Sequence, residues 1–376
     1  MSIEYLGLSQ INGPLVAVEG IRDGFYDEIV ELTVAGSKKK LGRIVEISRD
    51  KALIQVFEST DEMSLSNTHT RPTGHSMEIE LSEEILGRTF NGLGEPIDGL
   101  GKIKPECMRD VNGLPLNPCT REYPRNYIRT GISAIDGLTT LIRGQKLPIF
   151  SGNGLPHDQL AAQIVEQASL GEDSDEKFAI VFAAMGVKYD VAEFFRRTFE
   201  ESGASSHVVM FLNLSNDPVV ERLITPKVAL TAAEYLAFEK NMHILVILTD
   251  MTAFAEAMRE VSSMKGEIPS RKGFPGYLYS ELAAIYERMA EAGISNAGAY
   301  VRKMALNGYI LHIDLAPVKE LISLQRRCSN NLNQVAIHAH TYGVYPEEID
   351  GLKRDYEKLW GEVSKVLREL SELVAK

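Results

Sequence analysis

The first eighty residues alternate between apolar and polar positions, in short runs that Gly, Asn and Asp interrupt. The runs are PLVAVEG (14–20), EIVELTV (28–34), LGRIVEIS (41–48), KALIQVF (51–57) and SMEIEL (76–81). A period of two is typical of strands with one buried face, and several such strands at regular spacing favour a small barrel or sandwich. We predict an N-terminal β-barrel over residues 1–78. The pattern allows either a collar that packs against neighbouring barrels or a stand-alone structural barrel.

After a Gly- and Pro-rich connector over about residues 81–124, the pattern changes to continuous apolar runs, each followed by a helical pattern. The runs are KLPIFSG (146–152), FAIVFAAMG (178–186), HVVMFLNLSN (207–216) and HILVILTD (243–250). Unbroken Val, Ile and Leu runs that alternate with helices indicate a parallel sheet with crossover helices on both faces. We therefore predict an α/β domain over residues 79–288.

The segment FSGNGLPHDQL (150–160) has the form of a phosphate-binding loop without its chemistry. A working P-loop reads G-x-x-x-x-G-K-[ST], in which the Lys contacts the β- and γ-phosphates and the hydroxyl holds Mg²⁺. Aligned from Gly152, this chain has His157, Asp158 and Gln159 where Gly, Lys and Ser/Thr belong. We expect weak ATP or ADP binding, no tightly held Mg²⁺ and no catalytic residues. The candidate loop residues are Gly152, Asn153, Gly154, Leu155, Pro156, His157, Asp158 and Gln159.

The apolar run at 244–248 is followed closely by Asp250. An acid at the end of such a strand has the Walker B form and would lie near Mg²⁺ at the carboxyl edge of the sheet. Many strands of α/β proteins also end in Asp for structural reasons. We place Asp250 at the Walker B position.

Composition narrows the classes of function. The net charge of −12 argues against a general nucleic-acid surface, since neutralising phosphates requires an excess of Lys and Arg. The three cysteines show no metal-ligand spacing, and their odd, sparse count fits a reduced, cytoplasmic protein. No apolar run approaches the roughly 18–20 residues that span a bilayer, and no signal peptide is evident. We expect a soluble chain that reaches a membrane only through partners.

Residues from about 5 to 288 resemble the B subunit of archaeal and vacuolar-type rotary ATPases. The resemblance is carried by INGPLVAVEG, LGRTFNGLGEPIDG, YIRTGISAIDGLTTLIRGQKLPIFSGNGLPHDQLAAQI, ERLITPKVALTAAEYLAFEKNMHILVILTDMT and PGYLYSELAAIYER. It implies a non-catalytic, regulatory nucleotide site at a subunit interface, in a hexamer with a catalytic A subunit around a central stalk. The complex would translocate protons or sodium ions, and this chain would be peripheral to the membrane. The degenerate loop is a trait of that family.

After residue 288 the chain departs from that resemblance. The family would continue the sheet, then supply a PSLSR-type segment whose arginine completes the neighbouring catalytic site, and neither is present. Instead, AGISNAGAYVRKMALNG and RCSNNLNQVA resemble the plasmid mobilisation (MobC-like) relaxosome accessory family, which assists DNA nicking. We therefore expect an incomplete nucleotide-binding domain fused to a helical tail over residues 289–376.

The sequence of the tail predicts regular secondary structure. A helix from Ser295 to Leu306, a short strand YILHIDL (309–315) and a helix opened by Pro317 are predicted. Apolar residues at steps of three and four over 349–373 predict either a self-associating coiled coil or a helix packed on its own domain. The candidate DNA contacts are Arg302, Lys303, Arg326 and Arg327, for which a solvated helix face is the competing interpretation.

One amphipathic helix is predicted to cross the junction, because Leu282, Ile285, Tyr286 and Met289 follow a helical repeat. The leading interpretation is a truncated and fused non-catalytic B subunit that is not an enzyme on its own. The alternatives are an accessory DNA-binding protein of plasmid mobilisation and a non-functional chimera. DNA is a partner only under the first alternative.

Overall fold

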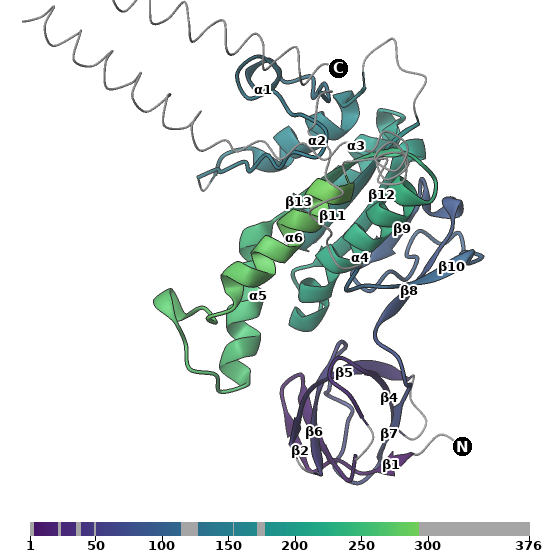
Figure 1. Cartoon of the computed structure of the whole chain (residues 1–376), viewed down its shortest axis with the longest axis vertical. Coiled ribbons are helices and arrows are strands. Elements are labelled where there is room, and N and C mark those ends of the chain that lie inside the picture. Colours follow the sequence, from purple (N-terminus) through teal and green to yellow (C-terminus); the bar gives the residue numbers. More distant parts are fainter. Residues whose placement is uncertain are drawn as a thin grey trace, which may run out of the picture. The chain divides into compact units, whose positions relative to one another are not determined.

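A computed structural model describes residues 4–21, 24–34, 39–48, 50–113, 127–152, 154–170 and 177–292. The predicted tail elements, namely the helix from Ser295, the strand at 309–315 and the repeat at 349–373, lie outside these residues. The same holds for the candidate DNA contacts Arg302, Lys303, Arg326 and Arg327. Figure 1 shows the described elements, from the N-terminal strands to α6 (Leu278–Ala292).

The N-terminal strands form a seven-stranded sheet in the order β1-β7-β4-β5-β6-β3-β2. The two end strands, β1 and β2, follow each other in the chain: β1 pairs with β7, and β2 pairs with β3. The segment 5–12 thus joins the two edges of the sheet and closes it into the predicted barrel. Alternate positions such as Val16, Val18 and Ile54 fill its interior. The strands are β1 (Tyr5–Leu6), β2 (Gln10–Asn12), β3 (Leu15–Glu19), β4 (Ile29–Val34), β5 (Lys40–Ser48), β6 (Lys51–Val56) and β7 (Thr68–Pro72).

Two expectations about the following segment were wrong. The run SMEIEL does not belong to the barrel, because β8 (Glu78–Leu81) pairs with β10 (Cys107–Asp110) in a separate two-stranded sheet. The Gly- and Pro-rich stretch is more than a connector, because β9 (Thr89–Asn91) pairs in parallel with β12. Three residues are too few for a periodic signal, so only pairing with the sheet identifies β9.

The parallel sheet predicted after the barrel is confirmed. Its order is β13-β11-β12-β9, with every described pair parallel. Both faces of the central strand β11 are buried: Val181 and Ala183 pack with α4, α5 and α6, whereas Ile180 and Phe182 pack with α2 and α3. This is why these strands read as continuous apolar runs. The elements are β11 (Phe178–Val187), β12 (Val208–Leu214), β13 (His243–Thr249), α1 (Ser133–Leu138), α2 (His157–Gln167), α3 (Tyr189–Glu201), α4 (Val219–Phe238), α5 (Met251–Met264) and α6 (Leu278–Ala292).

The run KLPIFSG (146–152), predicted as a strand, is not one. It joins no sheet, and Ile149 and Phe150 are 49% and 92% exposed. An apolar run becomes a strand only where a sheet edge accepts its backbone hydrogen bonds. In the described part of the chain the outer strands are β13 and β9, and neither receives this segment.

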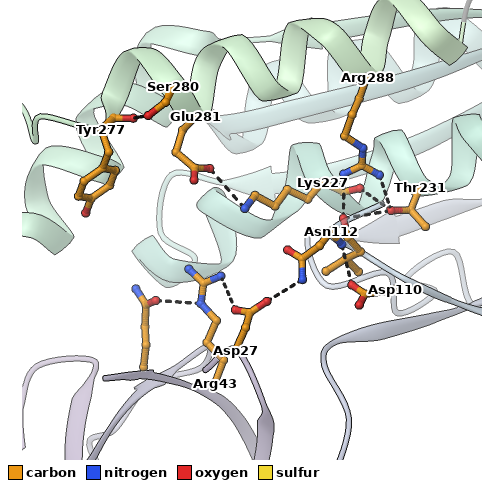
Figure 2. A network of polar contacts seen from close by, with 12 residues as sticks. Asp27, Arg43, Asp110, Asn112, Lys227, Thr231, Tyr277, Ser280, Glu281 and Arg288 are labelled. Atoms are coloured by element: carbon orange, nitrogen blue, oxygen red, sulfur yellow. Dashed lines mark hydrogen bonds and ion pairs between the residues drawn. The ribbon is translucent and has the colours of Figure 1, made fainter. Parts of the chain in front are cut away.

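The helix predicted across the junction is confirmed, since α6 runs through residue 288 to Ala292. Leu278 and Ile285 are buried against α4 and the sheet. Arg288 is only 7% exposed and reaches into the space between α4 and the end of β10 (Figure 2). The last described helix is therefore an integral part of the core.

Candidate functional site

The glycine-rich turn and the start of α2 have the backbone form that the sequence predicts. The N–H of Leu155 donates to the Gly152 carbonyl over 3.3 Å, and Gly154 adopts φ = 81°, a left-handed conformation that favours glycine. Helix α2 then begins at His157, and Pro156 caps it without a side-chain hydrogen bond. A helix N-terminus carries unpaired N–H groups and a partial positive charge, so this backbone attracts anions. Asn153 lies outside the described residues.

The side chains at this helix start oppose a phosphate. Asp158 lies in the first turn of α2, with its Oδ1 3.6 Å from Nε2 of His157. Nδ1 of His157 is 3.0 Å from the Leu155 carbonyl, and it donates there because a carbonyl only accepts. The carboxylate of Asp158 interacts favourably with the helix N-terminus in the way a bound phosphate would. The chain's own anion thus occupies the place where a P-loop has a cation.

Asp250 lies directly after β13, at the carboxyl edge of the sheet, as predicted. Its Oδ1 accepts a hydrogen bond of 2.8 Å from the Thr252 N–H and so caps α5. In the part of the chain that the structure describes, no hydrogen bond or ion pair joins Asp250 to the loop at 152–159. The neighbouring strand β11 ends at the buried Val187, followed by the exposed Lys188. No carboxylate follows directly at that strand end to orient a water molecule.

A polar cluster at the end of β12 was not predicted from the sequence. Oδ1 of the fully buried Asn213 accepts hydrogen bonds from the Gly186 N–H (3.1 Å) and from Nε of Arg222 (3.0 Å). The guanidinium of Arg222 also donates to the carbonyls of Leu214 and Ser215. Gly186 has φ = 66°, and a Cβ there would lie 2.7 Å from Nε of Arg222. The asparagine inside the apolar run VVMFLNL was the available signal.

Glu221 is a second buried group that the sequence did not reveal. It lies in the first turn of α4 with 7% of its surface exposed, and its Oε1 accepts a hydrogen bond of 2.9 Å from the Gly92 N–H. Burial, reinforced by the nearby Asp217 carboxylate, raises the pKa of Glu221 to about 7. A carboxyl group with such a pKa is about half protonated at neutral pH. It makes no described contact with the nucleotide loop.

Within the ranges that the structure covers, no group of three or more His, Cys, Asp or Glu side chains is arranged to hold a metal ion. Among the same residues, no helix combines the length and apolar character needed to cross a bilayer.

The fold and the site together define a class of protein. A parallel sheet has helices on both faces, a glycine-rich turn leads into α2, and an acid follows β13 directly. This is a P-loop-type nucleotide-binding domain with an altered loop, preceded by a β-barrel.

Comparison with known proteins identifies the family. Residues 8–74 match the beta-barrel domain of the ATP synthase alpha/beta family, and residues 131–300 match its nucleotide-binding domain. The V-type ATP synthase beta chain 2 of Clostridium tetani is 61% identical over 289 residues, or 77% of this chain and 63% of that protein. The V-type ATP synthase beta chain of Halothermothrix orenii is 59% identical over 285 residues, or 76% of this chain and 61% of that protein. The B subunit of the A-type ATP synthase of Aeropyrum pernix is 56% identical over 285 residues, with the same two shares, 76% and 61%. This part of the chain therefore belongs to the ATP synthase alpha/beta family, which confirms the predicted resemblance.

The chain spans about three-fifths of the length of these relatives. A different family model, that of the mobilization protein NikA, matches residues 279–339. The predicted resemblance of the tail to plasmid mobilisation proteins is confirmed as well. The NikA-like match begins inside α6, the helix that belongs to the nucleotide-binding domain.

Proposed function

We propose that residues 1–288 act as a non-catalytic, regulatory B-type subunit of a proton- or sodium-translocating rotary ATPase, held at the membrane periphery through its complex. The observation that carries the proposal is Asp158 at the N-terminus of α2, where a working loop needs a cation. The family match and the relatives' names, which include V-type and A-type ATP synthase chains, support it. We further propose domain boundaries at 78/79 and 288/289; the first falls within β8 and the second within α6.

The non-catalytic assignment rests on charge and on the strand ends. Asp158 repels a triphosphate, and Gln159 offers no hydroxyl to Mg²⁺. At the carboxyl edge, Asp250 caps α5 and β11 ends in Val187. Phosphoryl transfer depends on positioned cations and an oriented nucleophile, and these side chains supply neither. We therefore propose a weak ATP or ADP site with no tightly held Mg²⁺.

The purified full chain is expected to show no ATP hydrolysis above background. A coupled assay of ADP release with Mg·ATP measures this, and Asp250→Ala serves as the matched variant. Hydrolysis by the wild-type chain that disappears in Asp250→Ala would show that the site is catalytic.

Replacing Asp158 with Lys and Gln159 with Thr is expected to strengthen Mg·ATP binding about tenfold or more, because a repulsive carboxylate becomes an attractive ammonium. Isothermal titration calorimetry measures the change. The control is Asp190→Lys, which makes the same charge change in the first turn of α3. An equal gain in both variants would reduce the effect to net charge, and no gain in either would mean that residues 152–159 do not bind phosphates.

The proposed partners are a catalytic A subunit and a central stalk. Mixing this chain with both is expected to give dimers or aggregates with negligible turnover. Residues 146–152 stay outside the sheet and Phe150 is exposed. Residues 349–373 lie outside the described residues, and the coiled coil that their sequence predicts as one of two alternatives would compete by self-association. An arginine supplied in trans contributes on the order of 10³–10⁵ in rate, and no PSLSR-type segment supplies it here. Size-exclusion chromatography with light scattering measures the assembly, and an ATPase assay measures the turnover. A monodisperse 3:3 complex that hydrolyses ATP would contradict the expectation of dimers or aggregates.

A second candidate function follows from the NikA-like match at 279–339. Under it, the tail serves plasmid mobilisation through Arg302, Lys303, Arg326 and Arg327, with the N-terminal part as a passenger. A gel shift with origin-of-transfer DNA that the four alanine substitutions abolish would favour this function. A chain that neither binds this DNA nor assembles would be a chimera without either activity.

A further inference from the structure

A cavity of about 620 Å³ lies between barrel strands β5 and β6 and helices α4, α5 and α6. Its polar lining includes Arg43 and Gln55 from the barrel and Lys227, Lys265 and Glu281 from the α/β domain. Figure 2 shows Asp27 and Arg43 facing Asn112, with the Lys227–Glu281 pair on the helices above them. The nucleotide-binding loop does not line this cavity, and the proposed function does not use it.

The acid on the barrel side has its hydrogen bonds filled. Asp27 accepts from Nη1 of Arg43 over 3.2 Å through Oδ1, and from Nδ2 of Asn112 over 2.6 Å through Oδ2. Both of its oxygens therefore already bind donors of this chain.

The acids on the helix side are engaged too. Oε2 of Glu267 accepts hydrogen bonds from the hydroxyls of Ser262 (2.7 Å) and Tyr277 (3.1 Å). Glu281 pairs with Lys227 at 3.3 Å. A cation entering this cavity would have to displace existing partners from each carboxylate.

Unused hydrogen-bonding capacity lies on the donor side, first of all at Gln55. Its side chain is fully buried, and its Oε1 accepts a hydrogen bond of 3.1 Å from Nε of Arg43. This contact fixes the orientation of the amide, because the reverse orientation would set two donors against each other. Nε2 of Gln55 then has no partner among the described residues. A buried donor without an acceptor is unfavourable, and such groups indicate a missing ligand or water molecule.

Lys265 is the second donor with unused capacity. Its nearest carboxylate oxygen, Oε1 of Glu267, is 3.9 Å away, beyond hydrogen-bond distance, and its ammonium makes no hydrogen bond in the described chain. Burial lowers the pKa of Lys265; Glu267 opposes this, and the charge of Arg43 adds to the lowering. Two cations, one from the barrel and one directly after α5, thus repel each other across the cavity beside an unpaired amide donor.

We propose that this cavity is an anion-binding site that takes a small oxyanion, a phosphate, sulfate or carboxylate group, between Lys265, Arg43 and Nε2 of Gln55. Nη2 of Arg43 makes no described hydrogen bond and completes the set of donors. An oxyanion accepts several hydrogen bonds, and its negative charge attracts Lys265, which has no carboxylate within hydrogen-bond distance, as well as Arg43, which also pairs with Asp27. The anion links β5 and β6 to the residue that follows α5, so its binding stabilises the attachment of the barrel to the α/β domain.

Isothermal titration calorimetry of the full chain with inorganic phosphate, sulfate or acetate, at ionic strength held constant with chloride, tests the proposal. We expect saturable 1:1 binding and a thermal midpoint that rises with the anion. Comparing the three anions shows which group the site prefers. Lys265→Gln and Gln55→Leu should each weaken binding about tenfold or more. Lys51→Gln, at an exposed barrel pair with Glu19, is the matched control and should bind as the wild type does.

Several outcomes would overturn the proposal. If the anion binds at the nucleotide loop, Gln55→Leu and Lys265→Gln do not change its affinity. Equal affinities of these variants and the wild type would therefore mean that the anion does not bind in this cavity. The absence of saturable heat with all three anions would mean that the cavity holds only water. Circular dichroism of each variant without anion checks its folding. If Gln55→Leu does not fold, Lys265→Gln alone tests the proposal, because the Lys265 side chain is partly exposed and its replacement should leave the fold intact.

Discussion

Replacing Arg288 with alanine is expected to lower the free energy of unfolding by about 3–5 kcal/mol, because it leaves a buried partner charge uncompensated. Nε and Nη2 of Arg288 donate to the two carboxylate oxygens of Glu234 over 2.6 and 3.0 Å. Nη1 donates to the Val111 carbonyl over 2.8 Å, and Nη2 also reaches the Thr231 hydroxyl at 3.0 Å. The substitution removes the bidentate ion pair and leaves the Glu234 carboxylate without these donors. The Val111 carbonyl keeps only the 3.3 Å hydrogen bond from the Thr231 hydroxyl. Figure 2 shows Arg288 reaching toward Thr231.

Urea unfolding followed by circular dichroism measures this change, with Arg109→Ala as the control. Arg109 also pairs with a glutamate, Glu239, but both side chains are well exposed, so its loss should change the stability by less than about 1 kcal/mol. Double substitution of Arg288 and Glu234 should recover part of the loss. Equal effects of Arg288→Ala and Arg109→Ala would show that the Arg288 network does not stabilise the core.

Glu221→Gln is expected to stabilise the protein at high pH and to have little effect near pH 4.5. Burial raises the pKa of Glu221 to about 7 in the folded chain, from 4.5 for an unperturbed glutamate. The folded state therefore binds more protons than the unfolded state between these values, and stability falls as pH rises through this window. Above pH 7 the penalty is roughly 3 kcal/mol, from about 1.36 kcal/mol for each pKa unit. Glutamine carries no charge and still accepts from the Gly92 N–H, so it avoids the penalty.

Unfolding free energies of the wild type and Glu221→Gln at several pH values between 4.5 and 8 measure this difference. It should be near zero at the acidic end and reach its full size by pH 8. Glu19→Gln, at an exposed barrel position, controls for the loss of one surface carboxylate. A difference that stays constant across the range would mean that the carboxyl group ionises alike in both states.

Elements whose burial pattern decides their conformation were predictable from the sequence. The continuous apolar runs of β11 and β12 and the alternation in β3 to β6 predicted the sheet and the barrel, and the helical repeat across residue 288 predicted α6. The strand predicted at 146–152 failed, because its apolar residues have no accepting sheet edge in the described chain. Strand β9 was missed because it is defined by pairing alone. Periodicity reports which face is buried, but it does not report which partner buries it.

For the candidate site, the positions of the residues at the ends of helices and strands were predictable, but the contacts of their side chains were not. Asp158 was predicted at a helix start and Asp250 after an apolar strand, and both lie there in the structure. The hydrogen bonds by which Asp250 caps α5 and Asn213 holds Arg222 were not predictable, since they depend on side-chain geometry. Gln55 occupies a polar position in an alternating strand, which predicts exposure. It is buried because residues more than two hundred positions later in the chain cover that side of the barrel.

The position of Arg288 has a practical consequence for protein engineering. The side chain that fixes α6 lies almost at the end of the last described helix, four residues before Ala292. A domain fused after this point follows a helix that is already anchored in the core by Arg288. One fused domain can therefore be replaced by another without changes to the α/β domain. A reporter or an affinity domain fused after Ala292 should leave the thermal unfolding midpoint of the α/β domain unchanged. The same domain inserted before Arg288 should lower this midpoint.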